Sequence, residues 1–297
     1  MKRVGVLVHP TRPVARALET LRQWTSERGL ELVQIRAGEQ PEVAPEGDVT
    51  ACDLVAALGG DGTVLAALHA AAVSRTPVMG VAYGSLGAIT TVPEPELRAG
   101  LDRFAAGDWA ARRLPALSVD TPNGTVGWAI NDIVLARKGS TQLIVEVSVA
   151  GELYARLAGD GVILATPLGS SAYSMAAGGP LLSADLNALV CTPLAMHGGC
   201  APPLVIAGSQ EVTLEAHPGH GGFDVEIDGF ERQIAAERLR FIIKHDPEYT
   251  TLVDLGEVNA GLSGLRNRGL IADSPRVLFH DARVAGPAPT VTPTPGR

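Results

Sequence analysis

The sequence predicts an α/β domain with a doubly wound parallel sheet, followed by an all-β domain that resembles a sandwich. Through the first 110 residues, continuous apolar runs such as RVGVLVH and PVMGVAY alternate with segments of helical spacing. Strands that are apolar throughout are typical of parallel sheets covered on both faces. From about residue 112 the pattern changes to short β-runs separated by turns, which indicates a β-rich fold. We therefore expect one domain over residues 1–110 and a second over residues 111–250.

The expected elements of the first domain alternate between strand and helix. The first helical segment has regular apolar spacing and ends at Gly29, a residue typical of helix C-termini. Strands are expected at residues 3–9, 31–36, 52–60 and 77–83, and helices at residues 14–29, 62–73 and 94–108. The segment from about residue 250 to residue 285 is expected to pack back on this domain. The proline-rich residues 286–297 are expected to form a flexible tail.

The expected elements of the second domain are mostly short strands. The segment FDVEIDG, for example, alternates apolar and polar residues as a half-buried strand does. Strands are expected at residues 116–120, 125–136, 141–151, 152–159, 161–166, 203–208, 211–217, 223–229 and 238–245, and one helix near residues 171–178.

The composition excludes some classes of function. With 46% apolar and 19% charged residues, the 297-residue chain can bury a large core. A formal net charge of −8, without long basic tracts, argues against binding to nucleic acid or to an anionic membrane surface. No apolar run is long enough to span a bilayer, and the N-terminus has no signal-like cleavage region, so we expect a cytoplasmic protein. Three cysteines without C-x-x-C spacing indicate reduced thiols.

One glycine-rich turn predicts a phosphate site. The segment ALGGDGTVLAAL, residues 57–68, places GGDGT between a buried strand and a helix. The turn therefore lies at the carboxyl edge of the sheet, where open α/β folds bind ligands, and its amides suit a phosphate. A carboxylate at Asp61 would repel that phosphate unless it holds Mg²⁺ or accepts a proton from an attacking hydroxyl. From this motif alone, an Asp61 that merely caps the helix is equally compatible.

A second segment is rich in hydroxyl groups. GDGVILATPLGSSAYSMAAGGPLL, residues 159–182, follows an apolar strand and carries Thr166, Ser170, Ser171, Tyr173 and Ser174. Hydroxyls and free amides at this density suit the ribose, base and phosphates of a nucleotide. Together, the two segments resemble the signatures of the NAD kinase family. The wider superfamily with the first motif includes diacylglycerol and sphingosine kinases and, more remotely, phosphofructokinases, which do not share the second motif in this form.

The resemblance implies a role for each matching position. Asp61 corresponds to the aspartate that lies against the ribose hydroxyl and is the proposed general base, and the donor is ATP with Mg²⁺. The Asn-Glu pair that grips the acceptor nucleoside matches Asn131 and Asp132. The nucleotide-binding set implied for this chain is Gly59, Gly60, Gly62, Thr63, Asn131, Asp132, Asp160, Thr166, Ser170, Ser171, Ala172 and Tyr173. The implied site lies between the two domains and borrows residues from a neighbouring subunit, so we expect a homo-oligomer, either a dimer or a tetramer.

The chain departs from the family pattern around the acceptor. Within AYGSLGAI, Ala82 stands where the family usually has asparagine and Ala88 where it usually has phenylalanine. Asp132 replaces glutamate, and PLAMHGGCAPPL at 193–204 replaces the usual Pro-His-Ser-Leu region. Because these positions surround the acceptor, the expected acceptor is either NAD or another nucleoside-like molecule. The sequence does not distinguish ATP from polyphosphate as the donor.

Other polar residues have both a functional and a structural interpretation. His217 and His220 have a spacing that allows metal binding, although their glycine-rich flanks favour an exposed loop. His9 follows the first strand and either faces the ligand crevice or caps the turn. For Arg137, the functional interpretation is that it neutralises a phosphate, and the structural one is that it is solvated at a strand end. Asp228 matches a position that lies near the nucleotide in the family that the motifs resemble.

Three classes of function follow from these motifs. The first is an ATP-dependent NAD kinase that phosphorylates the adenosine ribose 2′-hydroxyl. The second is a related small-molecule kinase with a changed acceptor, such as a nucleoside, nucleotide or sugar. A lipid kinase lacks support because its second motif and a membrane-binding face are missing. The third class, a silent nucleotide-binding regulator, conflicts with the presence of Asp61.

Overall fold

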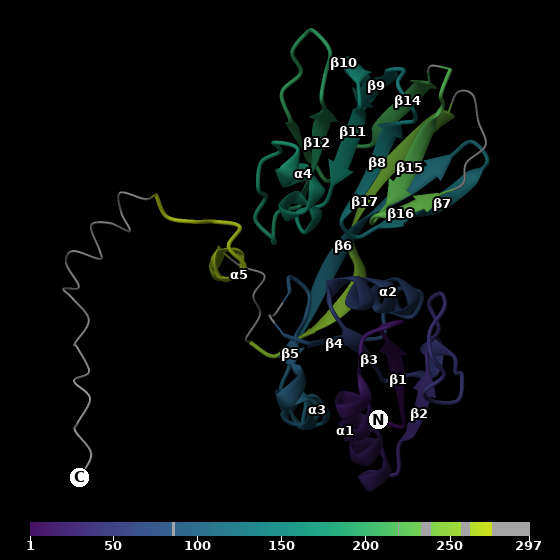
Figure 1. Cartoon of the computed structure of the whole chain (residues 1–297), viewed down its shortest axis with the longest axis vertical. Coiled ribbons are helices and arrows are strands. Elements are labelled where there is room, and N and C mark those ends of the chain that lie inside the picture. Colours follow the sequence, from purple (N-terminus) through teal and green to yellow (C-terminus); the bar gives the residue numbers. More distant parts are fainter. Residues whose placement is uncertain (85–86, 219, 233–238, 257–261, 275–297) are drawn as a thin grey trace, which may run out of the picture.

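A computed structural model describes residues 1–84, 87–218, 220–232, 239–256 and 262–274. The α/β domain lies at one end of the molecule and the β-rich domain at the other (Figure 1). The flexible tail expected at 286–297 lies outside the described residues, as do 257–261 and 275–285 of the segment expected to pack back. Among the described residues, no helix has the length and apolar character needed to cross a bilayer.

The first domain is built on a parallel sheet. Its strands lie in the order β4-β3-β1-β2, and a short strand β5 also pairs with β4. The bounds are β1 Arg3–Val8, β2 Glu31–Gln34, β3 Leu54–Gly59, β4 Val78–Ala82 and β5 Val92–Pro93. Alternate residues of β3 pack on opposite faces, because its side chains alternate across the sheet. Both faces are thus buried, which explains why the strands are apolar throughout.

Helices cover both faces of this sheet. Helices α1 Ala15–Glu27 and α3 Leu97–Ala105 pack on one face, and α2 Asp61–Ala71 packs on the other. Short helices η1 Val49–Ala51 and η2 Glu94–Glu96 complete the domain. This arrangement confirms the expected doubly wound α/β architecture.

The second domain is a sandwich of two sheets around one apolar core. One layer contains β10-β9-β14-β17, with β6 and β7 beyond β17, and the other is the six-stranded sheet β13-β12-β11-β8-β15-β16. The bounds are β6 Ala110–Thr121, β7 Gly124–Ala129, β8 Asp132–Arg137, β9 Leu143–Val149, β10 Glu152–Gly159, β11 Gly161–Ala165, β12 Ala188–Leu194, β13 Leu204–Ala207, β14 Val212–Pro218, β15 Phe223–Ile227, β16 Phe230–Arg232 and β17 Leu239–Asp254. Short helices are η3 Gly169–Ser171, α4 Tyr173–Ala176 and α5 Leu262–Asn267. The sandwich confirms the expected β-rich architecture.

Strands β6 and β17 run through both domains. They pair antiparallel from the sandwich to the α/β domain, where Leu252 of β17 pairs with Val78 of β4. The parallel sheet and one layer of the sandwich therefore form a single 11-stranded sheet. The sequence pattern predicts only the first half of β17, since the ladder is irregular between Asp246 and Thr250, where Pro247 interrupts the alternation.

Strand β12 was not expected from the sequence. Its sequence, ALVCTPL, contains Pro193, and a proline argues against a central strand. In the structure, the register with β13 ends at Cys191, so Pro193 lies beyond the ladder on that side. The missing amide is therefore tolerated.

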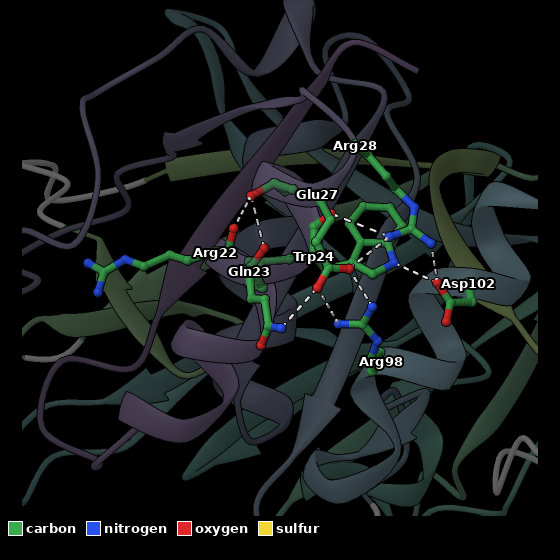
Figure 2. Close-up of polar contacts among 9 residues, drawn as sticks. Arg22, Gln23, Trp24, Glu27, Arg28, Arg98 and Asp102 are labelled. Atoms are coloured by element: carbon green, nitrogen blue, oxygen red, sulfur yellow. Dashed lines mark hydrogen bonds and ion pairs between the residues drawn. The ribbon is translucent and has the colours of Figure 1, made fainter.

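A polar network joins α1 to α3 (Figure 2). The indole Nε1 of the fully buried Trp24 donates to Asp102 Oδ1 at 2.7 Å, and Arg28 Nη2 donates to the same oxygen at 2.6 Å. The Arg28 guanidinium also lies 4.4 Å from the centroid of the Trp24 ring. Asp102 thus fixes the register of the two helices through a buried donor.

We expect Asp102→Ala to lower the free energy of unfolding by about 1–2 kcal/mol, because the Trp24 N–H loses a charged acceptor. Denaturant unfolding followed by tryptophan fluorescence would measure it. The matched control is Arg98→Ala, which removes only an exposed ion pair with Glu27 and should leave the stability nearly unchanged. Equal effects of the two substitutions would contradict this assignment.

Candidate functional site

The turn between β3 and α2 is built by glycines. A Cβ at Gly59 would lie 2.1 Å from Thr63 Oγ1, so the helix can start here only against a glycine. Gly60 is the N-cap, and α2 begins at Asp61, one residue earlier than the sequence suggested. The first turn of α2 therefore presents amides without helical partners at the carboxyl edge of the sheet.

Asp61 does not cap its helix. Its Oδ2 accepts a hydrogen bond from the amide of Ala88 at 2.8 Å, and its Oδ1 accepts one from the amide of Ile89 at 3.2 Å. A Cβ at Gly87 would lie 2.0 Å from Asp61 Oδ1, so the loop can approach the carboxylate only through a glycine. The loop after β4 therefore holds Asp61 in place. Gly87 is the sequence signal for this contact, although it is not one of the predicted site residues.

Asp61 and Gly62 line two cavities. One, of about 420 Å³, lies beyond the carboxyl end of β1 and includes Gly60, Thr63 and Arg12. The other, of about 290 Å³, lies between the domains. Its walls are formed by Asp61, Gly62, Leu65, Ala88, Ile89, Asn131, Leu168, Ser171, Ala172, Asp228 and Arg268. We call the first the sheet-edge cavity and the second the interdomain cavity.

The sheet-edge cavity is lined by the imidazole of His9 and the guanidinium of Arg12. His9 lines it, and its Nδ1 accepts from the amides of Thr11 and Arg12 at 3.1 and 3.0 Å. His9 thus faces the crevice and stabilises the turn at the same time. The Arg12 guanidinium lies against Gly60, where a Cβ would be 3.5 Å from Nη1. Arg12 was not singled out in the sequence, because one arginine after a strand carries no pattern.

Asp228 links the two domains beside the interdomain cavity. Its side chain is 1% exposed, and its Oδ1 accepts from the amides of Asn131 at 2.6 Å and Asp132 at 3.1 Å. Its Oδ2 accepts from the amide of Ile130 at 2.9 Å and lies 2.6 Å from Nε2 of His69 on α2. Asp228 itself has a positive φ of 53°, a backbone strain that this network of contacts maintains.

The Asp228 network sets the position of the predicted acceptor pair. Asn131 follows β7 and lines the interdomain cavity, and Asp132 begins β8 with only 6% of its surface exposed. Burial, and then the negative charges of Asp228 and Glu226, raise the pKa of Asp132 to about 7. At neutral pH this carboxyl group therefore exists in both protonation states, and its protonated form can donate a hydrogen bond.

The second motif divides between structural and cavity-lining residues. Thr166 and Ser170 are fully buried, and their hydroxyls donate to the carbonyls of Ile130 and Pro167, both at 2.7 Å. They shape the turn, together with Gly169, whose Cβ would lie 2.0 Å from the Asn131 carbonyl oxygen. Ser171 and Ala172, in contrast, line the interdomain cavity.

Asp160 and Tyr173 lie in a different place. They line a cavity of about 550 Å³ together with Arg137, whose Nε donates to Asp160 Oδ1 at 2.5 Å. Tyr173 is 46% exposed. Arg137 thus compensates a carboxylate of the predicted set, and within one subunit the structure separates this pair from Asp61. The nucleotide-binding role of every residue in the set remains a prediction.

The two histidines of the HPGHGG segment do not act together. His217 lies on β14, and its Nε2 is 3.6 Å from Glu146 Oε1, while His220 is exposed and outside this group. Glu146, Glu215 and His217 place their ligand atoms within 4.8 Å of one another. Arg156 and Arg240 pair with the two glutamates, so ion pairs account for the cluster.

Both halves of the chain match family models. Residues 13–109 match the ATP-NAD kinase N-terminal domain, and residues 130–252 match the ATP-NAD kinase C-terminal domain. The NAD kinase of Heliobacterium modesticaldum is 35% identical over 272 residues, which cover 86% of this chain and 95% of that protein. NAD kinase 1 of Streptomyces coelicolor is 31% identical, with 100% of this chain and 93% of that protein covered.

Two solved structures share the fold. Yeast NADH kinase complexed with NADH has a TM-score of 0.79 at 20% identity, covering 92% of this chain and 89% of that chain. An NAD kinase from Archaeoglobus fulgidus in complex with ATP has a TM-score of 0.72 at 21% identity. The match covers 91% of this chain and 100% of that chain.

The wild type is expected to lose stability between about pH 4 and pH 7 as Asp132 ionises, and the Asp132→Asn variant is expected not to show this loss. Because the native pKa is raised from 3.8 to about 7, the folded protein holds a proton that the unfolded chain releases between these pH values. The contribution of Asp132 to stability is therefore greatest below about pH 4 and decreases, by roughly 1.4 kcal/mol per pH unit, up to about pH 7.

Denaturant unfolding of both proteins across this range would measure the effect. The variant should become more stable than the wild type as the pH rises, and the difference should level off above about pH 7. Asp108→Asn changes an exposed aspartate and serves as the control. A difference between Asp132→Asn and wild type that does not vary with pH would contradict the assigned environment.

Proposed function

Because this chain belongs to the ATP-NAD kinase family, we propose that it transfers the γ-phosphate of ATP to the 2′-hydroxyl of the adenosine ribose of NAD, forming NADP. The observation that supports this most directly is the position of Asp61 in the wall shared by the sheet-edge and interdomain cavities. A donor in one cavity and an acceptor in the other would meet at this carboxylate. Phosphoryl transfer needs such positioning more than it needs covalent chemistry from the protein.

We assign ATP to the sheet-edge cavity. The first turn of α2 offers amides to a phosphate, and Gly60 and Gly62 place no side chain of their own in the way. The guanidinium of Arg12 adds a positive charge over the same turn. These groups supply the local compensation that a chain with a net charge of −8 must provide for a polyanionic ligand.

We assign the acceptor ribose to the interdomain cavity. Asp61 accepts the proton of the 2′-hydroxyl as its oxygen attacks the γ-phosphorus, and the bond from that phosphorus to the bridging oxygen breaks to release ADP. The hydrogen bonds from the Ala88 and Ile89 amides keep the carboxylate oriented toward this hydroxyl. Asn131 holds the ribose, Ser171 and Ala172 line the same cavity, and the partly protonated Asp132 lies buried directly behind Asn131 in the chain.

Magnesium fits the donor set at Asp61. Each of its oxygens accepts one amide hydrogen and retains a further lone pair, and Mg²⁺ in nucleotide sites takes one or two carboxylates together with phosphates and water. When bound, the ion would neutralise charge on the transferring phosphate. Asp61 is the residue that we expect to face it.

The proposal extends to assembly and location. Asp160 and Tyr173 line a cavity apart from Asp61, and the family resemblance places their counterparts around the acceptor adenosine. We therefore propose a homo-oligomer, a dimer or a tetramer, in which subunits complete one another's acceptor site, and we place it in the cytoplasm. Analytical ultracentrifugation would test the assembly.

The acceptor can be identified with the purified protein. Mg-ATP, or Mg²⁺ with polyphosphate, is incubated with NAD, NADH, nucleosides and sugars, and products are separated by chromatography. NADP formed at micromolar NAD supports the proposal. The alternative is a kinase with a smaller acceptor. It is favoured by the small side chain of Ala88, which leaves space in the interdomain cavity. Phosphorylation of a nucleoside but not of NAD would establish this alternative.

We expect Asp61→Asn to lower kcat by roughly 10²–10⁴-fold, because asparagine keeps the shape of the side chain but cannot accept the hydroxyl proton. Steady-state kinetics would give kcat, and calorimetry would show that ATP and NAD still bind. Asp108→Asn, which changes an exposed aspartate three residues after α3, is the matched control. Turnover within a few-fold of wild type would remove Asp61 from the mechanism.

A further inference from the structure

The interdomain cavity contains one residue from the C-terminal segment. Helix α5 lies beside the junction of the two domains (Figure 1). Its Leu265 is 8% exposed and lines a small crevice with Ala88 and Leu168. This contact seats α5 against the loop that holds Asp61 and against the second motif. Arg268, just beyond α5, thereby becomes part of the wall of the interdomain cavity.

Arg268 brings a positive charge into a wall that otherwise carries two carboxylates. Asp61 and Asp228 contribute carboxylates, and Arg268 is the one positively charged residue among the described residues that line the cavity. Its Nε donates to the Gly264 carbonyl at 3.3 Å, and within the described part of the chain its guanidinium forms no ion pair. Two terminal nitrogens are therefore available to a ligand. Arg266 differs, since its Nη2 lies 2.5 Å from Asp273 Oδ2.

An available guanidinium beside two carboxylates suits a phosphate ligand. A guanidinium binds phosphate oxygens in a bidentate manner, with charge-assisted hydrogen bonds that are about twice as strong as neutral ones. The sheet-edge cavity already has Arg12 and the amides of α2 for its anion. A dinucleotide in the interdomain cavity brings its own pyrophosphate, and the carboxylates of Asp61 and Asp228 would repel it.

We propose that Arg268 binds phosphate oxygens of the acceptor dinucleotide, so that the C-terminal segment supplies a binding residue of the interdomain cavity. The inference rests on the proposed function, since it takes the acceptor to be NAD. It predicts that positive charge at position 268 governs affinity for the acceptor and leaves affinity for ATP unchanged.

The test compares four full-length proteins: wild type, Arg268→Gln, Arg268→Lys and the control Arg266→Gln. Arg266 lies on α5, two residues before Arg268, and is paired with Asp273. Titration calorimetry measures the Kd of NAD and of Mg-ATP. Arg268→Gln should weaken NAD binding at least tenfold and leave Mg-ATP binding unchanged. Arg268→Lys should recover part of the loss, because it restores the charge but not the bidentate geometry. Arg266→Gln should bind as the wild type does.

The outcomes separate this inference from the proposed function. Unchanged NAD affinity in Arg268→Gln overturns it, and so does an equal loss of NAD and ATP affinity, which would indicate a structural role for α5. A weakened affinity for Mg-ATP alone would assign Arg268 to the donor and also overturns it. If the wild type binds NAD without forming NADP, the proposed function fails, while a charge-dependent loss of NAD affinity in Arg268→Gln still supports the role of Arg268.

Discussion

The pairing of β6 with β17 is the constraint on which the geometry of the site depends. This pairing joins the parallel sheet to the sandwich and so helps to fix the ends of β3, β7 and β15 relative to one another. The ladder makes both domains part of one sheet. At its irregular centre, the buried Thr250 donates to the Leu68 carbonyl of α2 at 3.1 Å, so the helix that begins at Asp61 is also attached to β17.

A second layer of contacts converts this arrangement into a defined site. Tyr249 of β17 stacks on Trp128 of β7 with ring centroids 4.8 Å apart, and its hydroxyl lies 3.5 Å from His69 Nδ1. His69 in turn contacts Asp228, which accepts the amides of Ile130 and of the predicted acceptor pair, Asn131 and Asp132. A displacement of α2 would therefore shift the position of Asn131 as well as that of Asp61, because tightly packed contacts transmit small movements.

Charge compensation is local in this acidic protein. Three arginines lie at the predicted site residues: Arg12 lies against Gly60, Arg137 donates to Asp160, and Arg268 lines the same cavity as Asp61. Guanidinium groups suit this role because they remain charged when partly buried and present several donors in one plane. The ligand sites proposed for this chain, whose net charge is −8, therefore depend on local positive charge.

The sequence by itself determined the architecture and the centre of the candidate site. Apolar strands, helical spacing and the two motifs depend on local periodicity and on glycine, so they can be read from neighbouring residues. It did not determine β12 or the full length of β17, because Pro193 and Pro247 interrupt their strand patterns. Nor did it determine which residues contact one another around the site, because these residues lie far apart in the chain. Asp228 reaches an amide 98 positions away, and Arg268 reaches the cavity from a helix with no motif of its own. Only the tertiary structure decided these contacts, since they arise from strand pairing and packing between distant segments, which leave no local periodicity in the sequence.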